Sequence, residues 1–362
     1  MKRILLYSNQ HVVFLKTERI CKKGEFVRSH YFQLALVCFS LLTVAFDSSF
    51  ADPGIIWVTG IANQQMRSGA QGDMRLDSGQ KINSQTPFNF ASLTKPFTGF
   101  LIWQLMREHH ISLDTPLKAL LPELPAVYAR VRVSDLLHHT SGIADYTFAC
   151  DGTSTSPLRA KKFLRELRTL EFQPGQAFQY SNSNFLILSW LSERLSKMDF
   201  AHALRKWVLL PAGMATAYLR TEVPIEYDAK VAWAYSLQSS GGLVLNTSNP
   251  CDVFTGDGGL IGSASDLVAW AKFLSSNLAS STPISELFIS GTHGLPGSGS
   301  YEYGLGWQII LDAKGLLYQH AGGWLGYRSI FRFRPKSQKW LVVLQNRDDW
   351  DIYSTADSIE NL

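Results

Sequence analysis

Ser92 and Lys95, in the run Ser-Leu-Thr-Lys, are the residues of this sequence best suited to chemistry. Residues at positions i and i+3 of a helix lie on one face, so the two side chains can meet. A serine hydroxyl is a weak nucleophile until a base takes its proton, and a desolvated lysine can be that base while it is neutral. The pair therefore predicts an activated serine that needs no histidine.

The context of this pair separates it from a chance match. The same spacing recurs at Ser78 and Lys81, but glycine and polar residues predict a turn there. Ser92 is instead followed by Pro96 and an apolar run to about Glu108, which predicts a buried helix with Ser92 at or next to its N-terminus. At that end the free backbone N–H groups favour a developing oxyanion.

Two later motifs add polar groups. Tyr180-Ser181-Asn182 is predicted on a loop that enters a helix, where a phenol can relay a proton and an amide can hold a substrate amide. His320-Ala321-Gly322-Gly323 is predicted at the end of a strand, where glycines let an extended substrate approach and pair with the edge. Alone, each motif has a simpler interpretation, namely a half-buried tyrosine and a surface or capping histidine.

The elements that must position these motifs are strands at both ends of the chain with helices between them. Strands are expected at residues 54–61, 307–311, 316–318, 327–333 and 340–344, and helices at about 93–108, 134–139, 157–170, 183–197, 200–209 and 264–275. This order predicts an α+β fold, with one antiparallel sheet built from both termini, flanking helices and an inserted, mainly helical domain. The expected sheet domain comprises residues 52–91 and 258–362, the helical domain residues 92–257, and the active site lies at their interface.

Residues 1–51 are expected to be an export leader with a long basic segment. Residues 31–46 form an uncharged run of 16 residues, shorter than the roughly 20 that a membrane-spanning helix needs. Small residues at Ser49 and Ala51 suit signal peptidase. We therefore expect a periplasmic or secreted protein that meets the membrane only transiently through its leader; an uncleaved N-terminal anchor is the alternative.

Charge and cysteine content limit the kinds of partner and metal that we expect this chain to bind. The leader holds seven Lys and Arg against three Asp and Glu, which leaves 27 of each in the rest of the chain. No basic stripe interleaved with aromatic residues follows, which argues against nucleic-acid partners. Cys150 and Cys251 can form a disulfide in an oxidising compartment, or stay as two free thiols in a reducing one. No spacing of Cys and His suggests zinc.

The three motifs and the segments that connect them resemble the serine β-lactamase and D-alanyl-D-alanine carboxypeptidase (penicillin-binding-protein-like) superfamily, closest to its class C-like branch. The resemblance covers about residues 53–350. No Gly-x-Ser-x-Gly elbow is present, so an α/β-hydrolase is disfavoured. The connecting segments that match, in family order, are residues 111–116 (ISLDTP), 120–122 (LLP), 133–143 (VSDLLHHTSGI), 258–260 (GGL), 263–267 (SASDL) and 303–307 (YGLGW).

The resemblance implies a role for each site residue. Ser92 is expected to be the acyl-accepting nucleophile. Lys95 and Tyr180 are expected to act together as the general base, taking the proton from Ser92 and passing it to the leaving group. Asn182 is expected to orient the substrate and Lys95. The implied reaction is acyl transfer through a serine ester followed by hydrolysis, with no metal or organic cofactor.

The substrate-binding groups implied on the predicted strand are His320, Gly322 and Gly323. The backbone N–H groups of Ser92 and Gly323 would form the oxyanion hole, and His320 would assist protonation or meet a substrate carboxylate. Many lactamases have lysine in place of His320, and histidine is only partly charged near neutral pH. Asp257 also stands beside Gly258 and Gly259, where a small neutral residue is usual, and can tune the pocket.

The leading hypothesis is an exported serine hydrolase that acts on a small amide, a D-amino-acid peptide, an ester or a peptidoglycan-like substrate. The histidine favours a carboxypeptidase, D-amino-acid peptidase or esterase over an efficient β-lactamase, but these activities stay open. The alternative from a different class is a non-catalytic cell-wall or penicillin-binding sensor. The intact set Ser92, Lys95, Tyr180 and Asn182 argues against that alternative.

Overall fold

The computed structural model describes residues 52–62, 64, 66–149, 157–220, 230–247, 255–278, 291–297 and 299–361. The chain divides into two units, Met1–Ser49 and Phe50–Leu362, and the described residues all belong to the second unit. The expected leader, Cys150 and Cys251 lie outside the described residues. None of the helices in the described part of the chain is both long and apolar enough to cross a membrane.

A seven-stranded sheet forms the centre of this unit, in the order β2-β1-β12-β11-β10-β9-β8, with every neighbouring pair antiparallel. Strand β1 pairs with β12 (Ile56 opposite Leu344), so segments from both ends of the unit share one sheet, as the sequence predicts. The strands are β1 (Ile55–Ile61), β2 (Arg67–Gln71), β8 (Glu302–Gly304), β9 (Trp307–Asp312), β10 (Gly315–Trp324), β11 (Tyr327–Arg334) and β12 (Lys339–Gln345).

Five further strands are two or three residues long and were not expected from the sequence. β3 (Phe88–Asn89), β7 (Leu260–Gly262) and β4 (Tyr218–Leu219) form one small sheet, and β5 (Tyr235–Leu237) pairs with β6 (Leu243–Leu245). Runs this short show no readable alternation of apolar and polar residues, so tertiary contacts decide them.

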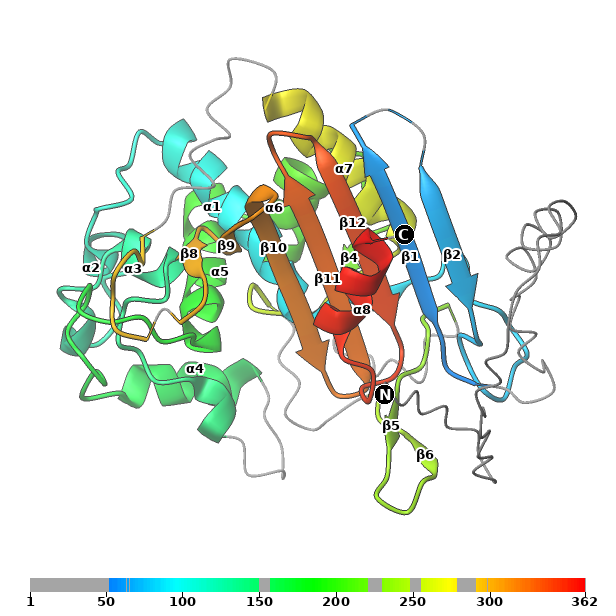
Figure 1. Cartoon of the computed structure of the whole chain (residues 1–362). Helices are drawn as coiled ribbons and strands as arrows, with labels where there is room; N and C mark the ends of the chain where they lie inside the picture. The colour runs from blue at the N-terminus through cyan, green and yellow to red at the C-terminus, as the bar shows by residue number, and fades with distance from the viewer. Residues whose placement is uncertain are drawn as a thin grey trace, which may run out of the picture. The chain divides into compact units, whose positions relative to one another are not determined.

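Helices cover both faces of the large sheet. Figure 1 shows α8 on one face and α1 and α7 on the other. Each helix expected from the sequence is present, whereas α2 and α8 were not expected. The α-helices are α1 (Lys95–Glu108), α2 (Leu117–Leu120), α3 (Val133–Leu137), α4 (Pro157–Glu166), α5 (Asn182–Ser196), α6 (Phe200–Leu204), α7 (Ala264–Leu278) and α8 (Ile352–Glu360). Shorter helical turns are η1 (Ala91–Thr94), η2 (Ala126–Tyr128), η3 (Tyr146–Ala149) and the π-helical η4 (Arg205–Leu209).

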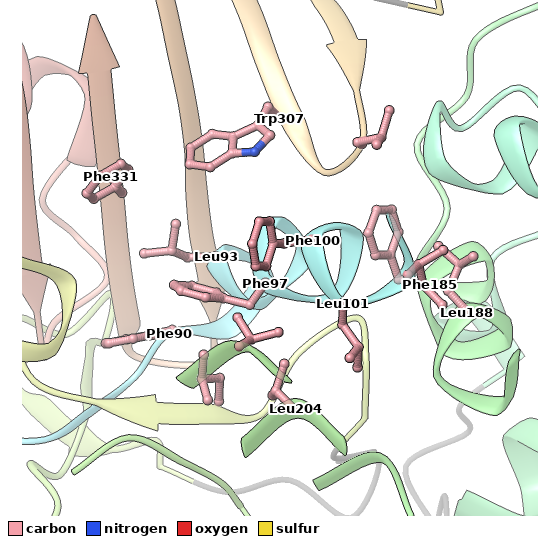
Figure 2. Packing of buried hydrophobic residues seen from close by; sticks show 14 of the residues in the cluster. Phe90, Leu93, Phe97, Phe100, Leu101, Phe185, Leu188, Leu204, Trp307 and Phe331 are labelled. Atoms are coloured by element: carbon pink, nitrogen blue, oxygen red, sulfur yellow. The ribbon is translucent and has the colours of Figure 1, made fainter. Parts of the chain in front are cut away.

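Helix α1 connects the sheet to the helical part of the chain. It is buried on almost all sides, as an apolar helix in the middle of a core must be. Figure 2 shows Phe97 and Phe100 of α1 near Trp307 of the sheet, while Phe185 of α5 lies at the opposite end of the view. Ser92 and Lys95 stand at the start of this helix, so burial of α1 fixes their positions.

Strand β10 corrects one expectation. The sequence predicted a strand that ends near His320, but β10 continues through Trp324, paired with β11 from Tyr318 to Trp324. In the sequence the two glycines suggest the end of a strand, but both pair with residues of β11, so the strand continues. Pairing of β10 with β9 stops at Gln319 opposite Gln308, so residues 320–324 have no β9 partner. The expected division at residues 91–92 and 257–258 into two domains stays a prediction.

Candidate active site

Ser92 lies in the helical turn that leads directly into α1, as the sequence predicted. The preceding residue, Ala91, has φ of 48°, a left-handed conformation that is strained for a residue with a Cβ atom. The Asn89 side-chain oxygen accepts a hydrogen bond from the Ala91 N–H at 2.9 Å and supports this turn. The strained turn presents Ser92 to a pocket of about 460 Å³.

The Lys95 side chain is fully buried and points its Nζ atom at three oxygens. Nζ donates to Asn182 Oδ1 at 2.8 Å, to the Asp257 carbonyl at 2.8 Å and to Ser92 Oγ at 3.1 Å. The first two oxygens can only accept, so a neutral Lys95 keeps its two hydrogens on them. The nitrogen lone pair then faces the Ser92 hydroxyl, which is the geometry of a general base.

Burial also makes the neutral form of Lys95 accessible. Desolvation lowers the pKa of the Lys95 amine from 10.5 to about 8, although the charges of Asp257 and Asp145 act in the opposite direction. With a pKa of about 8, about one molecule in ten carries a neutral lysine at pH 7. Lys95 is therefore equipped to take the Ser92 proton near neutral pH.

Asn182 is held in the orientation that Lys95 requires. Its backbone N–H and its side-chain Nδ2 both donate to Asp145 Oδ2, each at 2.9 Å. A carboxylate only accepts, so Nδ2 must face Asp145 and Oδ1 must face Lys95. Asp145 in turn accepts hydrogen bonds from the backbone N–H and hydroxyl of Thr147. Sequence reasoning missed Asp145, which follows the matching segment 133–143 by two residues.

Asp257 is the buried acid beside Lys95. Its side chain accepts hydrogen bonds from the Tyr146 hydroxyl at 2.8 Å and from the Thr255 hydroxyl at 2.9 Å. Desolvation raises the pKa of the Asp257 carboxyl, while the nearby Lys95 charge lowers it. Asp257 therefore contacts the base through its backbone carbonyl and influences it through its side-chain charge.

Tyr180 completes the group around the serine. Its hydroxyl shares the pocket with Ser92, which interacts with the phenol, and Lys95 Nζ lies 4.8 Å from the centre of its ring. Desolvation raises the pKa of the Tyr180 phenol well above 10, so the phenol keeps its proton at neutral pH. The structure thus brings Ser92, Lys95, Tyr180 and Asn182 together, and it favours Lys95 as the base and Tyr180 as a proton relay.

His320 lines the same pocket, but not in the state that the sequence suggested. The ring is buried; Nδ1 lies 2.7 Å from the Ala321 carbonyl and Nε2 lies 2.8 Å from the Tyr303 hydroxyl. The carbonyl only accepts, so Nδ1 carries the proton and Nε2 accepts from Tyr303. Desolvation lowers the pKa of His320 to about 3. The ring is therefore neutral with both nitrogens engaged, and the two roles expected of it, assisting protonation or meeting a substrate carboxylate, stay predictions.

Gly322 and Gly323 differ in what surrounds them. A Cβ atom on Gly322 would lie 2.0 Å from the Phe90 carbonyl oxygen and 3.0 Å from the Leu93 nitrogen. Gly322 therefore lets β10 approach the backbone around Ser92, whereas the sequence suggested an approach by substrate. A Cβ atom on Gly323 would meet only the end of the Arg328 side chain, at 3.5 Å. The role of the Gly323 N–H in an oxyanion hole stays a prediction.

The outer rim of the pocket comes from residues that sequence reasoning missed. They lie just before β8, on β9 and β11, on the segment that joins β12 to α8, and at the start of α8. The only signal in the sequence was the charged and aromatic run Arg-Asp-Asp-Trp-Asp at residues 347–351. Within the described residues, no group of three or more His, Cys, Asp or Glu side chains could hold a metal ion. The missed rim residues are Tyr301, Gln308, Arg328, Asp348, Trp350, Asp351, Ile352 and Tyr353.

Two curated proteins are similar in sequence to most of this chain. Penicillin-binding protein 4* of Bacillus subtilis is 26% identical over 291 residues, which are 76% of this chain and 64% of that protein. A D-aminopeptidase of Gluconobacter oxydans is 28% identical over 269 residues, 72% of this chain and 49% of that protein. The chain thus spans about half to two thirds of the length of these relatives.

A solved structure shows the same fold. The octameric penicillin-binding protein homologue from Pyrococcus abyssi superposes with a TM-score of 0.75 at 25% identity, covering 85% of this chain and 72% of that one. The predicted α+β, β-lactamase/transpeptidase-like fold is confirmed by this match. The beta-lactamase family model matches residues 50–359. The chain therefore belongs to the beta-lactamase family, whose fold it shares with penicillin-binding-protein and D-aminopeptidase relatives.

Proposed function

We propose that this protein is an exported serine hydrolase that forms an acyl-enzyme on Ser92. The observation that carries the proposal is the placement of the buried Lys95 amine, 3.1 Å from Ser92 Oγ and with its other two hydrogens fixed on carbonyl oxygens. A lysine with a pKa of about 8 in this position is a functional base rather than a structural cation.

In the proposed acylation, neutral Lys95 takes the proton of Ser92 while Oγ attacks the substrate carbonyl carbon. The N–H groups of Ser92 and Gly323 would stabilise the developing oxyanion. The bond from the carbonyl carbon to the leaving nitrogen or oxygen then breaks, and Tyr180 passes the proton from Lys95 to the leaving group. Water hydrolyses the serine ester, releases the acid and restores Ser92.

The proposed substrates are small amides, D-amino-acid peptides or esters, with peptidoglycan-like fragments included. The D-aminopeptidase and penicillin-binding-protein relatives support this class. A neutral His320 supports this substrate class as well, because that position then offers no positive charge to bind the carboxylate of a β-lactam. The proposed export to the periplasm or medium depends on the composition of residues 1–51, and N-terminal sequencing of protein recovered outside the cytoplasm tests it.

The test of function is covalent labelling followed by a substrate panel. Intact-mass spectrometry after exposure to a fluorophosphonate should show one adduct on the wild type and none on Ser92→Ala. Ser78→Ala is the matched control, because Ser78 has the same spacing to a lysine but lies in an exposed turn. Hydrolysis of a D-alanine nitroanilide, a D-Ala-D-Ala peptide, a nitrophenyl ester and a penicillin then separates the substrate classes. An adduct that survives Ser92→Ala would refute the proposal, and one that forms with penicillin but never hydrolyses would favour a sensor.

A further inference from the structure

His139 is a buried histidine that has no part in the steps above. It lies two residues beyond the end of α3, is fully buried, and has φ of 57°, a conformation that few residues other than glycine adopt. Its carbonyl oxygen accepts a hydrogen bond from the Gln179 N–H at 2.9 Å. The backbone of His139 therefore holds the segment that leads directly into Tyr180.

The His139 ring is also tied to the residues that follow Tyr180. Nδ1 lies 3.2 Å from the Ser181 N–H nitrogen and 3.0 Å from Asn184 Nδ2. The Asn184 amide is oriented by Ser141, whose hydroxyl donates to Asn184 Oδ1 at 2.6 Å. Both neighbours of Nδ1 are therefore donors, which makes Nδ1 the unprotonated nitrogen and places the proton on Nε2.

The same ring packs against the aromatic side of the site. The centres of the His139 and Tyr180 rings are 4.3 Å apart, and the Tyr303 and Phe185 rings lie at 4.6 Å and 5.2 Å. Tyr303 in turn donates to His320. His139 thus joins the proton-relay phenol to the wall of the pocket.

The imidazole is not needed merely to fill space. Nε2 is buried and finds no hydrogen-bond partner among the described residues. A buried donor without an acceptor is costly, and a phenylalanine ring would fill a similar volume without that cost. Desolvation, assisted by the nearby Lys95 charge, keeps the pKa of His139 well below 6.5, so Nδ1 stays free to accept. Compared with an apolar ring, the imidazole adds a hydrogen bond that Nδ1 accepts from the Ser181 backbone N–H, next to Tyr180.

We propose that His139 is a positioning residue for Tyr180. Its ring packs against the Tyr180 ring, and its Nδ1 accepts a hydrogen bond from the Ser181 backbone. Together these contacts hold the Tyr180 hydroxyl next to Ser92. The inference rests on the proposed function, because the place of Tyr180 matters only if Ser92 reacts.

Two substitutions separate the two contacts. His139→Asn tolerates the left-handed backbone and offers a side-chain oxygen near the place of Nδ1, but it removes the ring. His139→Phe keeps a ring and removes the acceptor. Each should slow fluorophosphonate labelling of Ser92 about tenfold to a hundredfold, because a displacement of about 1 Å in a reacting group costs that much. The control His138→Asn alters the adjacent histidine, which packs against Gly291, and should change the rate by less than about twofold.

A double-mutant cycle with Tyr180→Phe distinguishes positioning from a general structural role. If His139 acts through the Tyr180 hydroxyl, His139→Phe should change the labelling rate of the Tyr180→Phe protein by less than about twofold. An equal loss in both backgrounds would overturn the inference, as would failure of both His139 variants to fold by circular dichroism. A wild-type protein that takes no label would instead refute the proposed function, so the two failures are distinguishable.

Discussion

Asn182 Oδ1 accepts a hydrogen bond from Lys95 Nζ at 2.8 Å, although the two residues are 87 positions apart in the chain. The contact has a fixed direction, because Asp145 holds the other end of the amide. Two hydrogens of Lys95 Nζ point at carbonyl oxygens, and the remaining position on the nitrogen faces Ser92. That position carries a hydrogen when the amine is charged and a lone pair when it is neutral. The protonation state of a single buried amine should therefore control the reactivity of the serine.

We expect kcat/KM of the wild type to rise with pH through a midpoint near 8, since burial lowers the pKa of Lys95 to about 8 and only the neutral amine accepts a proton. Lys95→Arg keeps a positive charge but cannot act as a base at these pH values, and it should lower kcat/KM at least about a thousandfold. Initial rates with a nitrophenyl ester between pH 5.5 and 9.5 test both statements. A flat profile, or an active arginine variant, would contradict the role given to Lys95.

Asn182→Asp should move the rising limb of this profile to higher pH by about one unit or more, because a carboxylate beside Lys95 favours its charged form. The matched variant Asn182→Ala removes the acceptor without adding a charge, so it should lower the rate without that upward shift. The measurement is kcat/KM against pH for the three proteins side by side. Equal midpoints for the wild type and Asn182→Asp would show that Lys95 does not set the limb.

Gly322→Ala should lower the free energy of unfolding by about 1–3 kcal/mol or more, because its Cβ would lie 2.0 Å from the Phe90 carbonyl oxygen. Gly323→Ala is the control, since its Cβ would meet only the flexible end of Arg328 at 3.5 Å. Urea unfolding of the two variants and the wild type gives the comparison. Similar stabilities for the two variants would mean that β10 can move away from the Ser92 turn at little cost.

Acid should destabilise the protein partly through His138, whose pKa burial lowers to about 4. Above pH 6.5 this histidine is neutral in the folded and unfolded states, and between pH 6.5 and 4 only the unfolded chain takes up the proton. The free energy of unfolding should therefore fall as the pH falls through this window, by up to about 3 kcal/mol from this group. His138→Asn should flatten that dependence when urea unfolding at pH 7 and pH 4.5 is compared, whereas the exposed His109→Asn should not.

The sequence predicted the long elements well because each carries a repeated signal. The apolar run after Pro96 requires a buried helix, and the apolar segments from 327 to 344 can only be adjacent strands of a core. The sequence did not predict helix α8, because its buried face consists of only Ile352, Ala356 and Ile359 in an otherwise polar segment. That helix becomes stable only where the sheet offers an apolar surface to those residues.

The spacing of Ser92 and Lys95 is a local property, so the sequence alone determined that a hydroxyl and an amine share the first turn of a buried helix. Tertiary structure decided the rest: which carbonyls hold Lys95, that Asp145 orients Asn182, and that His320 is neutral. Those outcomes depend on desolvation and on hydrogen-bond partners from distant segments. Neither is encoded in the spacing of residues along the chain, because both arise only when α1, α5, β10 and the segments that hold Asp145 and Asp257 come together in the folded protein.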